Sequence, residues 1–215
     1  MHVKAMRLRP PIPMMSFNPV MDGYTRHAAT NSAWNVLTAG GGTFADYDEI
    51  YPGYVCDAAY VGYNCHSTSN KFNNLNRPIL IFNLAQLSAS PGSGRLGLWM
   101  YHQNTAVADG VKIGVYASSP ASDNEIVAGD FDSVGSTLLS DEVAYADIVS
   151  GDLTWFNLNA AGLAAITPGA MLRLCLRIDY DVNDTTPPWQ SNAAEWAWYA
   201  TMWDTLHDIP RLELT

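Results

Sequence analysis

The sequence predicts an all-β fold: a two-sheet antiparallel β-sandwich of the jelly-roll kind, with an extended N-terminal arm and one short helix. Leucine and isoleucine alternate with other residues in Met171–Asp179, and this period of two is typical of a strand with one buried face. Turn signals such as Ser90–Gly92 and Thr167–Gly169 separate the apolar segments. Only Asn159–Ile166 has a helical composition, and it is too short to be more than a connector.

Strands are expected at regular intervals after residue 76. Ile79–Leu84 is apolar at successive positions, so we expect a central strand that is covered on both faces. The expected strands are Arg77–Leu87, Arg95–His102, Val111–Ser118, Glu142–Val149, Leu153–Asn159, Met171–Val182, Glu195–Trp203 and Pro210–Thr215.

The chain divides into three parts. Residues 1–21 are interpreted as an extended arm, because Pro10, Pro11 and Pro13 favour polyproline II over helix. Residues 22–76 lack a regular pattern, and we expect loops and short strands that belong to the sandwich or pack on it. Residues 77–215 are expected to form the sandwich itself, and 215 residues are enough for one substantial core.

The charge is unevenly distributed between the arm and the rest of the chain. Residues 1–16 carry Lys4, Arg7 and Arg9 and no acidic residue, which leaves 8 basic and 21 acidic residues, a net charge of −13, in the remainder. So acidic a body disfavours binding to nucleic acid. The arm is either a solvated tail or a docking peptide, with Lys4, Arg7, Arg9, Pro10 and Pro11 as its candidate contacts to an acidic neighbour such as an identical subunit.

Two further features bear on the compartment in which the chain folds. The first 17 residues lack an apolar stretch of signal-peptide length, and no window has the roughly 20 apolar residues of a membrane span, so we expect synthesis in a cytoplasm and no membrane partner. Eight residues separate Cys56 from Cys65, a spacing that allows either a hairpin-like disulfide or two free thiols.

The motifs of common enzyme classes are missing from the sequence. There is no G-x-S-x-G, H-E-x-x-H or Walker motif, and the five histidines are scattered. Nothing supplies a recognisable nucleophile–base pair, so we expect a protein that is not an enzyme.

An acidic segment after the alternating strand starts like a calcium loop. Asp179, Asp181 and Asn183 stand at the first, third and fifth positions. Asp184 then replaces the required glycine, and Gln190 replaces the bidentate glutamate, so an EF-hand is excluded. A looser structural calcium site formed by Asp179, Asp181, Asn183 and Asp184 and a simple acidic turn remain as alternatives, and no other cofactor is expected.

Aromatic residues are concentrated in the C-terminal third. On a strand, Trp196 and Trp198 share one face, and Tyr199 and Trp203 share the other. We expect the first pair to be core and the second pair to pack against a loop or a neighbour. The alternative is that Trp189, Tyr199 and Trp203 form a platform for sugar rings or a subunit interface.

Six segments, in order along the chain, are similar to the sandwich domains of tailed-phage virion proteins. Arg77–Leu84 resembles the R-x-x-L-x-F-D strand of that family. The other similar segments are Val111–Ser122, Ala128–Asp141, Trp155–Ile166, Leu172–Asn183 and Pro210–Leu214. The resemblance covers roughly residues 77–215, and the first 76 residues depart from it.

The resemblance implies a non-enzymatic component of a virion, such as a capsid decoration or a fibre-like subunit. Such domains resemble carbohydrate-binding modules and occur in oligomers, so the implied partners are further copies of the chain, as a trimer by analogy, and other virion proteins. The first 76 residues are where attachment to the particle is expected. The alternative function is a carbohydrate-binding module that recognises a glycan on a host surface.

Overall fold

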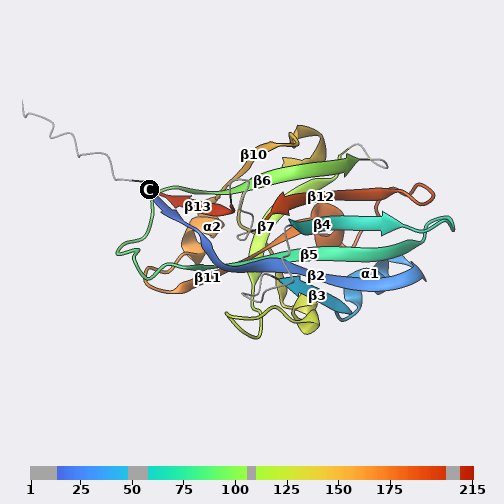
Figure 1. Cartoon of the computed structure of the whole chain (residues 1–215), viewed down its shortest axis with the longest axis horizontal. Helices are drawn as coiled ribbons and strands as arrows, with labels where there is room; N and C mark the ends of the chain where they lie inside the picture. Colours follow the sequence, from blue (N-terminus) through green and yellow to red (C-terminus); the bar gives the residue numbers. More distant parts are fainter. Residues whose placement is uncertain (1–13, 48–57, 106–109, 202–208) are drawn as a thin grey trace, which may run out of the picture.

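The computed structural model describes residues 14–47, 58–105, 110–201 and 209–215, and these residues fold into antiparallel β-sheet with a few short helices (Figure 1). The all-β prediction is confirmed, while the jelly-roll connectivity stays a prediction. The described strands are β1 Met15–Phe17, β2 Pro19–Ser32, β3 Phe44–Tyr47, β4 Ala58–Cys65, β5 Phe72–Asn83, β6 Gly94–Thr105, β7 Lys112–Ser118, β8 Val134–Leu138, β9 Val143–Ala144, β10 Asp152–Asn157, β11 Met171–Ile178, β12 Ala194–Ala200 and β13 Arg211–Leu214. The helices are α1 Trp34–Ala39, α2 Ala160–Ala165 and α3 Asp179–Val182, and the 3₁₀ turns are Ala128–Asp132 and Tyr145–Asp147.

Strand β5 belongs to both layers of the sandwich. It pairs with β2 along one edge, while its other edge pairs first with β4 and then with β11. The front layer, which Figure 1 views face-on, runs in the order β3, β2, β5, β4, β12, β6. The back layer continues from the second half of β5 through β11 and β7 to β8 and β9.

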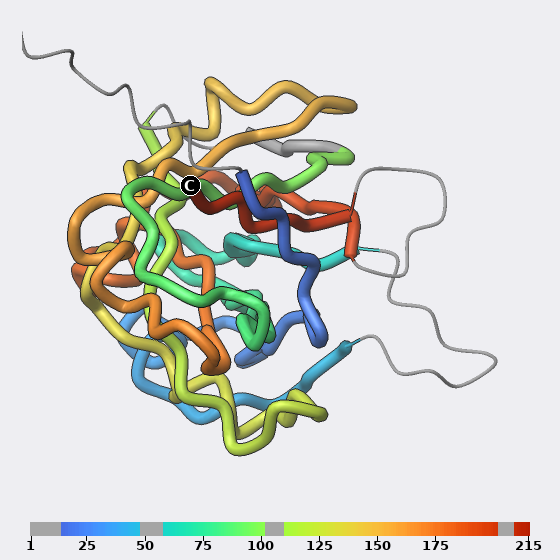
Figure 2. The backbone as a smooth tube through the Cα atoms, turned by 90° about the vertical axis from the view of Figure 1, so that its left-hand side faces the viewer, coloured from blue at the N-terminus to red at the C-terminus, as the bar shows by residue number. Residues whose placement is uncertain are grey.

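The two ends of the described chain meet at one end of the sandwich. Met15 pairs with Leu214 and Phe17 with Leu212, so that β1 lies antiparallel to β13. Figure 2 looks at the molecule from this end and shows the first described residues beside the C-terminal strand.

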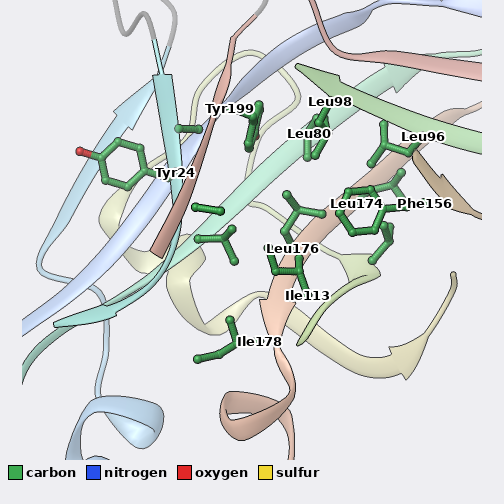
Figure 3. Packing of buried hydrophobic residues seen from close by; sticks show 14 of the residues in the cluster. Tyr24, Leu80, Leu96, Leu98, Ile113, Phe156, Leu174, Leu176, Ile178 and Tyr199 are labelled. Atoms are coloured by element: carbon green, nitrogen blue, oxygen red, sulfur yellow. The ribbon is translucent and has the colours of Figure 1, made fainter. Parts of the chain in front are cut away.

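The main core fills the space between the layers. Leu80, Leu174 and Leu176 from the back layer meet Leu96 and Leu98 of β6, and all five are at most 1% exposed (Figure 3). The leucine face of Met171–Ile178 therefore points inward as predicted, because only one face of β11 borders this core.

A second, smaller cluster covers the opposite face of β5 and β11. Ile79 and Ile81 are completely buried there and cluster with Met21, Tyr116 and Cys175. Because Leu80 and Phe82 face the main core, β5 is buried on both faces, which confirms the expectation for Ile79–Leu84.

A charged group lies inside the fold where β11 ends. Asp181 accepts hydrogen bonds from Arg77 Nη2 at 2.6 Å and from Arg177 Nε at 2.7 Å, and all three side chains are buried. Arg77 also stacks on Phe131, with its Cζ 3.9 Å from the ring centroid. The strand predicted for Met171–Val182 was therefore too long: the chain turns into α3 after Ile178, which carries Asp181 back to the two arginines.

Several predicted elements differ from the structure in where strands form and how long they are. The irregular segment expected for residues 22–76 contains most of the 14-residue strand β2 together with α1, β3, β4 and the start of β5, and it is an integral part of the front layer. The predicted strand Glu142–Val149 shrinks to β9 and a 3₁₀ turn, whereas β8 was missed. The predicted helix is present as α2, capped by the Asn159 side chain.

No helix in the described parts of the chain combines the length and apolar character needed to cross a membrane.

Candidate functional site

A row of aromatic side chains crosses the outer face of the front layer, and we call Phe44, Tyr24, Tyr60, Trp196 and Trp198 the aromatic row. The ring centroids of Phe44 and Tyr24 are 6.0 Å apart, and those of Tyr24 and Tyr60 are 5.2 Å apart. Tyr60 lies 5.8 Å from Trp196 and 5.3 Å from Trp198, edge to face with the latter. Contacts of this tilted and edge-to-face kind are favourable for aromatic pairs.

Strand alternation places the row on the outside of the sandwich. On β4, Ala59 and Val61 are buried in the core, so Tyr60 between them points outward. On β12, Ala197 and Tyr199 are completely buried, while Trp196 and Trp198 are only partly buried. Figure 3 shows Tyr24 and Tyr199 separated by the strands of this layer.

The face assignment expected for β12 was therefore wrong. Trp196 and Trp198 were expected in the core. Tyr199 was expected to pack against a loop or a neighbour, with a sugar platform or subunit interface as the alternative, but Tyr199 is 0% exposed. Alternation fixes which side chains share a face and leaves open which face is inside. Here the register places Ala197 opposite Val61, a buried residue of β4, and that pairing decides the question.

The two other aromatics of that prediction have different outcomes. Trp189 is partly buried against the main core, and its Nε1 donates a hydrogen bond of 3.0 Å to the carbonyl oxygen of His66. It is therefore held in place by a loop and is separate from the aromatic row. Trp203 lies outside the described residues.

Arg26 is the basic residue beside the aromatic row. Its Cζ lies 5.4 Å from the ring centroid of Tyr24 and 5.5 Å from that of Phe44, within the range of cation–π attraction. Its Nε donates a hydrogen bond of 2.7 Å to Oδ1 of Asn76. The guanidinium is thus fixed between the rings and the amides of β5.

Amide side chains continue the same face next to the rings. Asn64 of β4 stands directly opposite Asn74 of β5, and Gly62 stands opposite Asn76. Within the part of the chain that the structure describes, the buried Oδ1 atoms of Asn64 and Asn74 and the Nδ2 of Asn76 have no hydrogen-bond partner. Such unsatisfied buried groups are uncommon in native proteins.

The looser calcium site, one of two alternatives for the acidic segment, does not form among the described residues. Asp181 is occupied by Arg77 and Arg177, Asp179 accepts a hydrogen bond from the backbone of Lys112, and Asp184 accepts one from Thr38. Asn183 is exposed and continues the turn with a backbone hydrogen bond to Asp179. The acidic turn was the correct alternative. Elsewhere in the described residues, no group of three or more His, Cys, Asp or Glu side chains is arranged to hold a metal ion.

The remaining candidate residues are cysteines and arm residues. Cys65 is a free, buried thiol, and burial raises its pKa. Burial likewise raises the pKa of Cys175 to about 12, so this thiol stays protonated in the folded protein at neutral pH. Cys56 and the docking candidates Lys4, Arg7, Arg9, Pro10 and Pro11 lie outside the described residues.

Sequence reasoning missed most of the aromatic row. Tyr24, Phe44 and Tyr60 lie in the segment that was interpreted as irregular, and their common face arises only when β3, β2, β5 and β4 pair. The signal available beforehand was the density of aromatics between residues 24 and 63. No family model matches the chain, and no curated protein sequence is significantly similar to it.

Proposed function

We propose that this protein is a non-catalytic β-sandwich subunit that recognises glycans through the aromatic row. The observation that carries the proposal is the continuous contact of five rings on one sheet face, where Phe44 is 43% exposed, Tyr60, Trp196 and Trp198 are partly buried, and the linking Tyr24 is 5% exposed. Sugar rings offer apolar C–H faces and hydroxyl edges. Aromatic side chains that are flanked by an arginine and amides meet both requirements.

We expect Trp198→Ala to weaken glycan binding by about tenfold or more, because it removes one stacking surface from the row. The ligand is first selected on a glycan array with the wild-type protein, and the dissociation constants of both proteins are then measured by calorimetry. Trp155→Ala is the matched control, since Trp155 is a partly buried tryptophan that stacks on Arg95, with 3.8 Å between Cζ and the ring centroid, away from the row. Equal losses in the two variants would count against the aromatic row as the binding surface.

We further propose that the subunit is a capsid decoration or fibre-like component of a phage particle, attached through its N-terminal region and forming an oligomer. Two observations favour this second role. The segments that resemble phage virion domains supply β5, β7, β10, β11 and β13 of one sandwich. Strand β1 pairs with β13 at one end of the sandwich, and Phe44, Tyr24 and Tyr60 of the aromatic row lie on β3, β2 and β4.

Deletion of residues 1–13 is expected to reduce an oligomer to a monomer while glycan binding persists. The deletion stops before Met15, because removing residues 15–17 would also remove the strand that pairs with β13. Light scattering gives the mass of both forms. The matched control is a charge-reversed arm with glutamate at Lys4, Arg7 and Arg9, which separates the role of charge from that of chain length. An unchanged oligomer after deletion would contradict assembly through the arm.

A further inference from the structure

We infer that the aromatic row takes a neutral, hydroxyl-rich oligosaccharide and rejects glycans that carry carboxylate, sulfate or phosphate groups. The inference rests on the proposed function, because it specifies the ligand of the same face. It is carried by two observations that are independent of the rings: the amides beside them and the charges around them.

The amides lie on the same face as the rings. Tyr60 and Asn64 are separated by an even number of positions along β4, so both point away from the core residues Val61 and Tyr63. Gly62 stands between them without a side chain, and no bulk there separates the amides from the rings. Asn74 and Asn76 face the same way because they pair with Asn64 and Gly62.

The hydrogen-bonding character of these amides selects the ligand. Asn76 is 1% exposed, and its Nδ2 has no partner in the described residues although its Oδ1 accepts from Arg26. The two Oδ1 atoms of Asn64 and Asn74 are acceptors only. A sugar hydroxyl donates to such oxygens and also accepts from an amide N–H, whereas a carboxylate, sulfate or ionised phosphate oxygen only accepts.

Small side-chain rotations make the amides available to a ligand. The side chains of Asn64 and Asn74 are only partly buried, although their oxygen atoms are covered. The terminal torsion of asparagine has a broad, shallow profile, so either amide turns without leaving a favourable rotamer. After such a rotation, an Oδ1 atom that had no partner accepts a hydrogen bond from the ligand.

The charges around the rings also favour a neutral ligand over an anionic one. Asp46 of β3 pairs directly with Tyr24 of β2 and is partly buried, so its carboxylate belongs to the face of the row. Asp22 is completely buried and pairs with Leu80, so it adds no charge to that surface. The guanidinium of Arg26, the cation beside these rings, already contacts two of them and Asn76. An anionic glycan would therefore find no free cation among these side chains, and it would approach a protein whose net charge is −10.

The test compares the binding of two sets of oligosaccharides by calorimetry, each two to about six sugar units long, at low and high salt. One set is built from neutral glucose, galactose or mannose, and the other from uronate or sulfated sugars. We expect binding to a neutral series with little salt dependence and none to the charged series. Asn74→Ala is expected to weaken binding by about tenfold, and Asn64→Ala similarly, because each removes one acceptor. Asn124→Ala, an exposed loop amide, is the control and is expected to bind like the wild type.

Three outcomes distinguish the inference from the function on which it rests. Binding of a charged series that is lost in Trp198→Ala overturns the inference and leaves glycan recognition by the row intact. Binding of no sugar in either set overturns both. Neutral binding that is unaffected in both Asn74→Ala and Asn64→Ala overturns the role of the amides, and thermal unfolding of each variant checks that a loss of binding is not a loss of fold.

Discussion

Asp181→Ala is expected to lower the free energy of unfolding by about 3–5 kcal/mol, one of the largest effects of any single substitution in this protein. The substitution leaves the guanidinium groups of Arg77 and Arg177 buried without their shared carboxylate. Arg77 retains its bonds to the backbone oxygens of Phe131 and Thr38, and these do not neutralise its charge. Urea unfolding of wild type and variant at pH 7 measures the difference.

Asp123→Ala is the matched control for this prediction. Asp123 binds Arg173 through two hydrogen bonds, but both side chains are about a third exposed, so we expect a loss of no more than about 1 kcal/mol. A similar loss for both aspartates would show that burial of the Asp181 group does not matter.

The pH dependence of the same variant gives a second readout. Burial alone would raise the pKa of Asp181, but Arg77 and Arg177 outweigh burial and hold the pKa below its ordinary value of 3.8. The stabilisation is therefore fully present above the unfolded-state pKa and is lost as the pH falls through the folded-state pKa. The stability difference between wild type and Asp181→Ala should shrink on acidification below the ordinary pKa and stay constant from pH 6 to 8.

The second large effect is expected for Gly62→Ala, which should cost about 3 kcal/mol or more and abolish glycan binding. Gly62 has a φ of +133°, a conformation that residues with a side chain rarely adopt. A Cβ at this position would collide with the carbonyl oxygen of Glu195 and lie 2.7 Å from Cα of Trp196 and 2.8 Å from the hydroxyl of Tyr145. The pairing of β4 with β12 would have to open, and the two tryptophans of the row would move with β12.

Gly129→Ala is the control for the glycine prediction. A Cβ at Gly129 would meet no atom within 4 Å, and the backbone there is in an ordinary conformation, so we expect a change within about 0.5 kcal/mol. Chemical unfolding and calorimetric titration with the selected glycan apply to both variants. Wild-type binding by Gly62→Ala would contradict the proposed dependence of the row on the β4–β12 register.

β5 and β11, at the centre of the sandwich, were predictable from local sequence because the burial of each face is visible in a few consecutive residues. The side chains of β11 alternate between the main core and the second cluster, Ile79–Leu84 of β5 is apolar because both of its faces are buried, and the alanine-rich segment forms α2. Each of these signals resides in a few consecutive residues. The all-β class and most strand positions after residue 76 follow from them.

The candidate site was harder to predict because it depends on pairing between distant strands. β2 carries polar residues on both faces, so it lacks the alternating pattern of a half-buried strand, and its pairing with β3 and β5 is visible only in the structure. The same holds for Asp181, which resembles a calcium ligand in sequence and is recognised as a partner of Arg77 only when residues 104 positions apart meet. The choice between Trp198 and Tyr199 as the outward residue also required the register of β12.

The pairing of Met15 with Leu214 determines when this protein is able to complete its fold during synthesis. The β1–β13 pair joins the two ends of the described chain, and Arg77 pairs with Asp181 across a separation of 104 residues. Residues 15 to 214 must therefore be synthesised before this pair is able to form. Contacts between such distant residues slow folding, so the nascent chain exposes its strand edges for longer than a helical protein of equal length. Chaperone capture in that interval is the expected cost of joining the first strand to the last.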